Sequence, residues 1–252
     1  QVIWDVKSDK NIWEKVDARY HRSKSGGGSW EYYKEIPESW KIKYKDFTFN
    51  VKPTGFKHTG IFPEQAVNWQ KTRRLCALKP GMRVLNLFGY TGGATVALAA
   101  HGAFVTHVDA AKGMVERCRQ NAELSGVAKD KIRYIVDDCK KFVAREIKRG
   151  KTYDAVIMDP PSYGRGPSGE MWKLEDSIYD LTALTAKLLP DPQFFLLNSY
   201  TTGLQPQVIK NILEIVLSGR KGGTEAYEVG LPVTLDKNII LPCGCSGMWI
   251  KE

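Results

Sequence analysis

Between residues 83 and 218, short apolar runs alternate with longer stretches in which apolar residues recur at helical spacing. The apolar runs predict buried strands over residues 83–88, 103–108, 132–136, 153–158 and 193–198. The stretches between and after them predict helices over residues 93–100, 111–125, 138–149, 172–189 and 205–218. This alternation predicts an α/β fold with a doubly wound parallel sheet and helices on both faces. Two further strand-like runs, 225–230 and 248–251, bring the expected sheet to seven strands, with a Pro/Gly-rich link between them.

The N-terminal part of the chain has a different composition. Residues 1–60 are basic and rich in tryptophan, and residues 40–45 and 47–52 alternate apolar with polar side chains. This alternation predicts a hairpin with one wet, positive face. Such a face could hold RNA, or its lysines could only keep an edge strand soluble. We therefore expect a small β-rich extension over residues 1–60 and the main domain over residues 61–252.

The sharpest signal is the junction that follows the first predicted strand. Apolar residues 84–88 run into the turn Gly89-Tyr90-Thr91-Gly92-Gly93, and a helix is predicted directly after it. A strand that ends on such a turn brings backbone N–H groups and a helix N-terminus to one point, which suits a nucleotide-like cofactor. We expect glycine there because a Cβ atom would keep the cofactor away from the backbone. This turn has neither the Gly-x-Gly-x-x-Gly spacing nor a following Gly-Lys-Ser/Thr, so neither the dinucleotide fingerprint nor a P-loop is indicated here.

Acidic residues follow the next predicted strands, where an open parallel sheet holds its ligand. Asp109, twenty residues beyond Gly89, is placed to accept hydrogen bonds from both hydroxyls of a ribose. Asp137 and Asp138 close the third strand, where Asp138 either accepts from an adenine amine or caps the following helix.

The fourth strand ends in a carboxylate followed by a rigid turn with few N–H donors, Asp159-Pro160-Pro161-Ser162-Tyr163. The Asp159 carboxylate and the Pro160 carbonyl could accept hydrogen bonds from the amino group of a base, while Tyr163 stacks on its face. Asn198 ends the fifth strand and is expected to face the same crevice. The candidate catalytic residues are therefore Asp159, Pro160, Tyr163 and Asn198.

These segments together resemble a known family. Residues 86–93, Val108-Asp109, Asp137-Asp138 and the Asp159-Pro-Pro-Ser turn are similar to the S-adenosylmethionine motifs of the large-subunit ribosomal RNA methyltransferases, usually described as 23S rRNA (cytosine-C5)-methyltransferases. Residues 59–65 are similar to that family's Lys-Thr-Gly-x-x-Leu-Asp-Gln-Arg segment, and the similarity extends over residues 47–250. It implies a Rossmann-like class I methyltransferase fold, S-adenosyl-L-methionine (SAM) as methyl donor and structured RNA as substrate. The cofactor-binding residues it implies are Gln65, Asn86, Phe88, Gly89, Tyr90, Thr91, Gly92, Asp109, Ala110, Asp137, Asp138 and Asp159.

Two departures from the family's pattern matter. The PUA RNA-binding domain of many members has no counterpart in this sequence, where the basic, Trp-rich segment stands instead. The cysteine that the family carries at the end of the fifth strand is replaced by Asn198-Ser199, which resembles the guanine-N7 branch more closely. We therefore do not expect methylation at cytosine C5.

Composition narrows the expected function further. The 252 residues carry a net charge of +9 and a pI near 9.2, which favours a polyanionic partner. No run of 18 apolar residues is present, so no membrane partner is expected, and the five scattered cysteines are typical of a reducing, cytoplasmic location. Cys243-x-Cys245 has no second pair, so no metal site is expected.

The function expected from the sequence is SAM-dependent methyl transfer to a nucleobase in RNA, with ribosomal RNA as the expected substrate. Two alternatives stay open: a methyltransferase acting on a protein or small molecule, and a catalytically silent RNA-binding protein that retains the SAM pocket. The first alternative predicts that substrate binding weakens little at higher salt. The second predicts that RNA and SAM bind without any methyl transfer. The Asp159-Pro160-Pro161 turn argues against the silent protein, because a cofactor pocket alone has no need of it.

Overall fold

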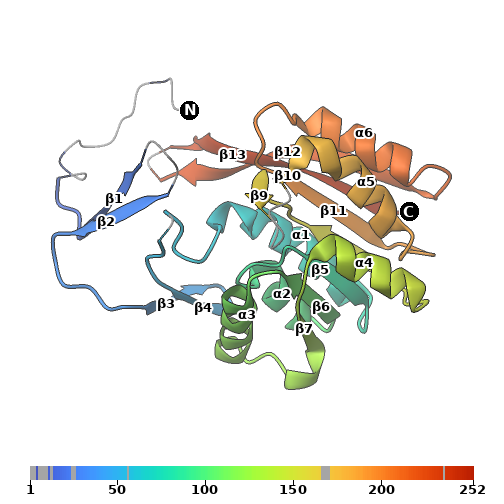
Figure 1. Ribbon diagram of the computed structural model, residues 1–252, viewed down its shortest axis with the longest axis horizontal. Coiled ribbons are helices and arrows are strands. Elements are labelled where there is room, and N and C mark those ends of the chain that lie inside the picture. Colours follow the sequence, from blue (N-terminus) through green and yellow to red (C-terminus); the bar gives the residue numbers. More distant parts are fainter. Residues whose placement is uncertain are drawn as a thin grey trace.

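The computed structural model describes residues 4, 11, 14–23, 27–55, 57–165, 171–234 and 236–252. A seven-stranded sheet in the order β12-β13-β11-β8-β5-β6-β7 runs through its centre (Figure 1). The strands are β5 (Arg83–Leu87), β6 (Phe104–Asp109), β7 (Ile132–Val136), β8 (Ala155–Met158), β11 (Phe194–Ser199), β12 (Gly222–Val233) and β13 (Asp236–Lys251). Strands β11, β8, β5, β6 and β7 are parallel, and β13 runs antiparallel to both of its neighbours. The predicted α/β fold with a mostly parallel, seven-stranded sheet is therefore confirmed.

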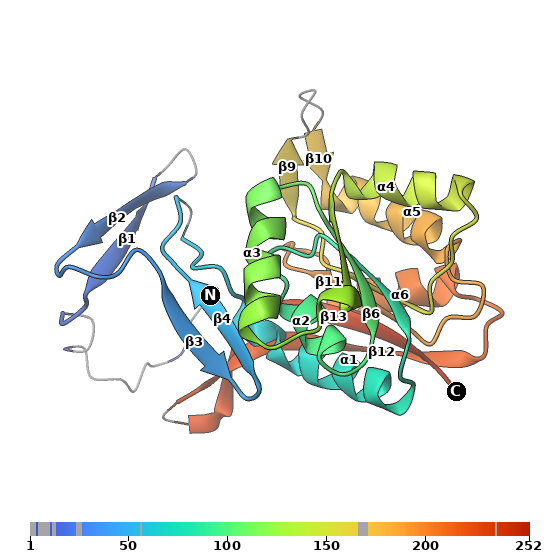
Figure 2. The same ribbon diagram turned by 90° about the horizontal axis from the view of Figure 1, so that it is seen from below.

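Helices cover both faces of this sheet. In the described part of the chain they are α1 (Ala66–Leu78), α2 (Gly93–Ala99), α3 (Lys112–Leu124), α4 (Cys139–Lys148), α5 (Leu174–Ala186) and α6 (Pro206–Val216), with the short 3-10 helices η2 (Pro63–Gln65) and η3 (Lys129–Lys131). Val156 and Met158 of β8 pack with α4, α5 and α6, whereas Ala155 and Ile157 pack with α1, α2 and α3 (Figure 2). Because both faces are covered, the strands read as continuous apolar runs. None of these helices has the length and apolar content that crossing a bilayer needs.

The predicted Pro/Gly-rich link between the last two strands is wrong. β12 and β13 instead extend toward each other as one long antiparallel hairpin, with register shifts at Val229/Gly230 and Pro232/Val233. Pro232 lies on β12, the edge strand of the sheet, where a residue without an N–H group costs no ladder hydrogen bond. Residues that usually form turns therefore mark bulges in a strand here.

Two short hairpins are absent from the predicted elements. They are β1 (Ala18–Arg22) with β2 (Gly28–Tyr32), and β9 (Tyr163–Arg165) with β10 (Met171–Lys173). The helix predicted from residue 172 consequently begins at Leu174, because residues 171–173 belong to β10. Strands of three to five residues are too short to show a clear period in the sequence.

The predicted basic hairpin is present as β3 (Trp40–Tyr44) and β4 (Phe47–Val51). The backbone N–H of Thr48 donates to Ser125 Oγ at 3.0 Å, and that of Asn50 donates to Asn121 Oδ1 at 2.8 Å. Both acceptors are side chains of α3 or of its C-terminal cap. The outer edge of β4 is thereby satisfied and does not remain open for another strand.

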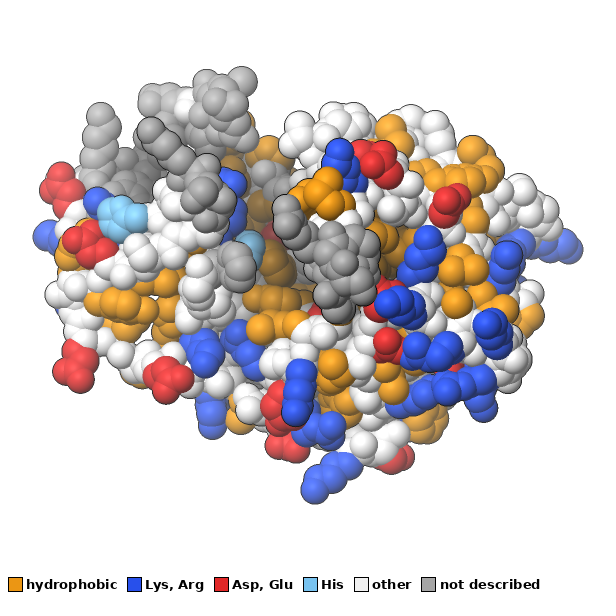
Figure 3. Space-filling view, in the orientation of Figure 1, with side chains coloured by type: hydrophobic (Ala, Val, Ile, Leu, Met, Phe, Trp, Pro, Cys, Tyr) orange, Lys and Arg blue, Asp and Glu red, His pale blue; other side chains and the backbone are white. Residues whose placement is uncertain are grey.

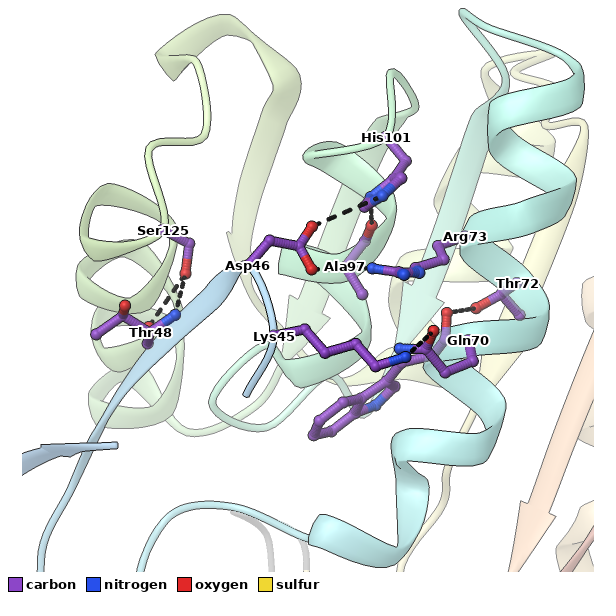
Figure 4. A network of polar contacts seen from close by, with 10 residues as sticks. Lys45, Asp46, Thr48, Gln70, Thr72, Arg73, Ala97, His101 and Ser125 are labelled. Carbon is purple, nitrogen blue, oxygen red and sulfur yellow. Dashed lines mark hydrogen bonds and ion pairs between the residues drawn. The ribbon is translucent and has the colours of Figure 1, made fainter. Parts of the chain in front are cut away.

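The turn of this hairpin is also fixed to α1 and to the end of α2 (Figure 4). Asp46 Oδ1 accepts from Arg73 at 3.0 Å, and its Oδ2 lies 3.7 Å from His101 Nε2. On the inner side, Phe47 and Phe49 are buried and join the core that α1, α2 and α3 form with the sheet. The hairpin therefore shares a core with the main domain. The division at residue 60 stays a prediction, and part of its first segment lies outside the described residues.

Candidate functional site

A cavity opens at the carboxyl ends of β5, β8 and β11, where an open parallel sheet holds its ligand. It is lined by Ile61, Phe62, Gln65, Asn68, Trp69, Thr72, Asn86, Phe88, Gly89, Tyr90, Thr91, Gly93, Ala94, Ile157, Asp159, Leu196 and Asn198. Eight residues predicted for the site are among them, from Gln65 of η2 to Asn198 of β11. The predicted residues outside this lining are Gly92, Asp109, Ala110, Asp137, Asp138, Pro160 and Tyr163.

The turn between β5 and α2 is held in a strained conformation. Phe88 and Tyr90 have φ angles of +56° and +50°, in the left-handed region that non-glycine residues rarely adopt. The backbone N–H of Gly89 donates to Val108 O at 3.0 Å, and that of Tyr90 donates to Asp109 Oδ2 at 2.9 Å. Both acceptors lie at the end of β6, so the neighbouring strand fixes the turn before any ligand binds.

The glycines of this turn are required by internal packing, a second reason beside the cofactor approach expected from the sequence, which stays a prediction. A Cβ atom on Gly89 would overlap the ring of His107 on β6. Gly92 has a φ of +86°, and a Cβ atom there would overlap the side chain of Cys118 on α3. Glycine thus allows the turn to lie directly against β6 and α3.

Asp109 ends β6 with both carboxylate oxygens oriented by the backbone. Oδ2 accepts from the N–H of Tyr90 and Oδ1 from the N–H of Ala111, each at 2.9 Å. Burial raises the pKa of Asp109, and the two backbone hydrogen bonds oppose that shift. The carboxylate is thus fixed beside the turn, where its remaining lone pairs could accept from a ribose.

The two acidic residues after β7 are engaged with α4. Asp138 caps α4, with its Oδ1 2.8 Å from the backbone nitrogen of Lys141, and Asp137 forms an ion pair with Arg145. Of the two roles predicted for Asp138, the capping role is therefore present. Contact of either carboxylate with an adenine stays a prediction.

Asp159 follows β8 and brings an unpartnered acid to the cavity. Its Oδ1 atom is buried, and no donor in the described part of the chain reaches it. Burial, with a smaller contribution from the Glu64 carboxylate, raises the pKa of Asp159 to about 7. A buried polar atom without a partner is costly in a folded protein, which favours a ligand group at this position. Near pH 7 the carboxyl group can hold or release a proton.

Asn198 belongs to a buried polar network beneath the cavity. Its Oδ1 accepts from Ser246 Oγ at 2.6 Å and from Asn68 Nδ2 at 3.1 Å. Its Nδ2 donates to Gln65 Oε1 at 3.3 Å, and Gln65 in turn donates to the Tyr200 hydroxyl at 2.7 Å. Both polar atoms of the Asn198 side chain are thus engaged within the protein. The network fixes the floor of the cavity, and direct participation of Asn198 in a reaction stays a prediction.

The β9–β10 hairpin places Trp172, and not Tyr163, beside the strained turn. The Trp172 ring lies 5.9 Å from that of Phe88 between centroids, and its Nε1 donates to the Pro161 carbonyl at 2.7 Å. Tyr163 pairs with Lys173 across the hairpin, so its side chain lies on the face opposite to Trp172. Tyr163 is 53% exposed, and its stacking on a base stays a prediction.

Comparison with known proteins agrees with this geometry. Residues 13–190 match the family model described as S-adenosylmethionine-dependent methyltransferase. The chain belongs to this family. This methyltransferase is 40% identical over 111 residues to ribosomal RNA large subunit methyltransferase I of Erwinia tasmaniensis, covering 44% of this chain and 27% of that protein. It is 34% identical over 151 residues to the protein of the same name from Klebsiella pneumoniae, covering 60% of this chain and 36% of that protein.

A solved structure also supports the assignment to the SAM-dependent methyltransferases. The SAM dependent methyltransferase from Agrobacterium tumefaciens has a TM-score of 0.92 to this chain at 30% identity, covering 100% of this chain and 82% of that one. Together with the family match, this likeness establishes the methyltransferase fold and SAM as the cofactor. The chain matches only about a third of the length of the two ribosomal RNA methyltransferases, so their substrate does not follow from the similarity alone.

The site of this methyltransferase fits SAM. The strained turn lines the cavity, and its N–H groups at Phe88, Gly89, Tyr90 and Gly92 already donate within the protein. Asp109 beside it offers an oriented acceptor for hydroxyl groups. Asp159 adds a buried oxygen that lacks a protein donor in the described part of the chain. We expect residues 88–92 to hold the amino-acid part of the cofactor and Asp109 its ribose. Among the described residues, His, Cys, Asp and Glu side chains form no group of three or more that could hold a metal ion.

One face of α1 that lines the cavity is not among the sequence predictions. Asn68, Trp69 and Thr72 lie three, four and seven residues beyond Gln65. This is the spacing of one helix face, so these three residues could have been predicted from the expected role of Gln65. Phe62, whose ring centroid lies 5.2 Å from that of Tyr90, left no such signal because it precedes the helix.

Proposed function

We propose that this methyltransferase transfers a methyl group from SAM to a nucleobase in RNA, with ribosomal RNA as the substrate. The observation that carries the proposal is the buried, unpartnered Oδ1 of Asp159 at the cavity, directly before the Pro160-Pro161 turn. A carboxyl group next to a backbone carbonyl suits the polar edge of a base that is turned out of its stack. Two matched relatives carry the name ribosomal RNA large subunit methyltransferase, and the net charge of +9 favours a polyanionic substrate.

SAM supplies an electrophilic methyl group when it is bound, and the residues of the chain have three tasks. Residues 88–92 and Asp109 bind and orient the cofactor. Asp159 hydrogen-bonds the base and holds or accepts a proton, for which a pKa near 7 is suited. The network around Asn198 keeps the floor of the cavity rigid, so that alignment of base and methyl group lowers the barrier.

We also place this activity in the cytoplasm. All five cysteines are free thiols, and two of them, Cys243 and Cys245, lie two residues apart on β13. Thiols persist in a reducing compartment, whereas pairs within reach of each other tend to oxidise outside it.

The test is methylation of large-subunit ribosomal RNA isolated from a strain that lacks this gene, with SAM carrying a labelled methyl group. Label in one nucleoside, identified by digestion and mass spectrometry, supports the proposal and assigns the base atom. The Asp159→Ala variant is expected to transfer nothing, whereas Asp180→Ala, which removes an exposed carboxylate of α5, is expected to transfer normally. Label confined to protein or to small molecules, or binding of RNA and SAM without transfer by the wild type, would refute the proposal.

A further inference from the structure

The outer face of α4 and its C-terminal cap carries basic side chains only. The exposed residues are Lys140, Lys141, Arg145, Lys148 and Arg149, which we call the α4 basic face. Glu146, the one acidic residue of this helix, is 1% exposed and points inward. Lys and Arg side chains gather over α4 in the space-filling view (Figure 3).

Neighbouring helices do not share this pattern. The exposed ionisable residues of α3 are Lys112, Glu116, Arg119 and Glu123, which balance in sign. The exposed charged residues within α5 are Glu175, Asp176 and Asp180, all of them acidic, and its C-terminal cap is Lys187. The outer face of α4 therefore differs from those of α3 and α5 in carrying charge of one sign, the positive one.

Part of the α4 basic face is neutralised within the protein. Buried Glu146 pairs with Arg149 at 3.1 Å and with Arg133 at 3.2 Å, and Asp137 pairs with Arg145. The residues of the face that form no ion pair with any described residue are Lys140, Lys141 and Lys148. These three lysines leave their full charge available to a partner.

Two of the three unpaired lysines work against the helix that carries them. Lys140 and Lys141 lie in the first turn of α4, where the helix dipole disfavours positive charge, whereas Lys148 lies in the last turn, where the dipole favours it. Lys141, Arg145 and Arg149 follow one another at four-residue spacing, which places like charges side by side. A helix face that served only solubility would carry both positive and negative side chains. The two lysines of the first turn cost the folded protein free energy, which a negatively charged partner would offset.

The α4 basic face begins beside the cavity. Cys139, the first residue of α4, accepts through Sγ from the backbone N–H of Phe88, a cavity residue, at 3.3 Å. Ten helical residues extend over about 15 Å, enough to lie along several phosphates of one strand. We propose that the α4 basic face, through Lys140, Lys141 and Lys148, holds the phosphate backbone of the RNA next to the methylated base. This assignment rests on the proposed function.

The test variant is Lys140→Gln/Lys141→Gln/Lys148→Gln in the full chain, which removes the three unpaired charges and leaves the cap and the ion pairs of α4 intact. Binding of protein-free large-subunit ribosomal RNA is measured over a series of salt concentrations. Thermal unfolding without RNA is measured in parallel, because a solvated face and a docking face differ in their effect on stability.

The matched control removes the same charge from elements other than α4. Lys79, Lys187 and Lys221 are exposed and precede β5, β11 and β12 at their amino ends, the edge of the sheet that α4 reaches only at Lys148. The control is therefore Lys79→Gln/Lys187→Gln/Lys221→Gln, which changes the net charge equally.

We expect the α4 variant to flatten the slope of log affinity against log salt by about 2 to 3, since each phosphate contact contributes roughly 0.7–0.9. The control is expected to keep the wild-type slope, and the α4 variant to melt at the same or a higher temperature than the wild type. Equal slopes for both variants, or a lower melting temperature of the α4 variant, would overturn the assignment while RNA binding by the wild type still supports the proposed function. A wild type that binds only vesicles of anionic lipid, and no RNA, would overturn both.

Discussion

The Oδ2 atom of Asp109 lies 2.9 Å from the backbone nitrogen of Tyr90, so the acid expected to bind the ribose also anchors the strained turn. Two parts of the cofactor site therefore depend on one carboxylate at the end of β6. Because backbone N–H groups already orient both of its oxygens, little freedom is lost when a ligand binds there.

Asp109→Ala is expected to weaken SAM binding by on the order of 1.5–3 kcal/mol, the contribution of charge-assisted hydrogen bonds. It should also lower the stability of the free protein, because the turn at Tyr90 loses an anchor. Calorimetry measures the first effect and thermal unfolding the second. Asp109→Asn keeps a neutral acceptor and is expected to fall between alanine and wild type. An unchanged dissociation constant in folded Asp109→Ala protein would remove Asp109 from the ribose site.

Gly89→Ala is expected to destabilise the protein in the absence of SAM. The added Cβ atom would overlap the His107 ring, and overpacking of this kind costs about 1–3 kcal/mol. Urea unfolding of the free protein measures the effect. Gly113→Ala is a control, because a Cβ atom at that position of α3 meets nothing within 4 Å. A Gly89→Ala protein that is as stable as wild type, yet unable to bind SAM, would show that glycine is needed here because the cofactor approaches the backbone.

The central sheet could be predicted because its strands are continuous apolar runs separated by helical periods, and the acidic residues that follow them mark the ligand edge. The β12–β13 hairpin could not, since Pro232 has the same local signature in a bulged edge strand as in a loop. The polar network was equally inaccessible. Asn68 meets Asn198 and Ser246 across 130 and 178 residues of sequence, and a separation of that kind leaves no local pattern.

The contribution of Asp159 to the stability of this methyltransferase is expected to fall as the pH rises from about 4 to about 7. The pKa of Asp159 is raised from 3.8 to about 7, so in this range the folded protein holds a proton that the unfolded chain has lost. Asp159→Asn removes this ionisation. It should match wild type near pH 4 and exceed it at pH 8, by at most about 4 kcal/mol at about 1.4 kcal/mol per pKa unit. Urea unfolding at both pH values measures the free energy of unfolding of the two proteins. A difference between variant and wild type that is equal at the two pH values would contradict a buried, titrating Asp159.

The lysines of β3 and its turn are expected to contact RNA phosphates as well. Lys41 and Lys43 are exposed on β3, whereas Lys45 already donates to Gln70 at 2.8 Å. Lys41→Ala/Lys43→Ala/Lys45→Ala should therefore flatten the salt dependence of RNA binding by roughly two contacts, each about 0.7–0.9 in slope. Filter binding at several salt concentrations measures the slope. Binding and methylation at wild-type levels would assign these lysines to solubility alone.

No cysteine of this methyltransferase is expected to act as a nucleophile. Methylation of cytosine at C5 needs a thiolate that adds at C6, and burial raises the pKa of all five thiols. Cys245 pairs with Ser199 across β11 and β13, which makes it a neighbour of the strand end where the resembling family carries its cysteine. Its thiol is nevertheless buried, donates to Leu204 O at 3.1 Å and does not line the cavity.

The Cys243→Ser/Cys245→Ser variant is therefore expected to transfer methyl groups at close to the wild-type rate, and Asp159→Ala to lose transfer. A ring nitrogen such as guanine N7 already carries a lone pair in the base plane, so it needs alignment with the methyl group and a suitable polar pocket, not covalent activation. Transfer is measured with labelled SAM, and RNA containing 5-fluorocytosine serves as a trap. A covalent adduct with that RNA that survives denaturation and is missing in the double variant would show that the reaction does proceed through a thiolate.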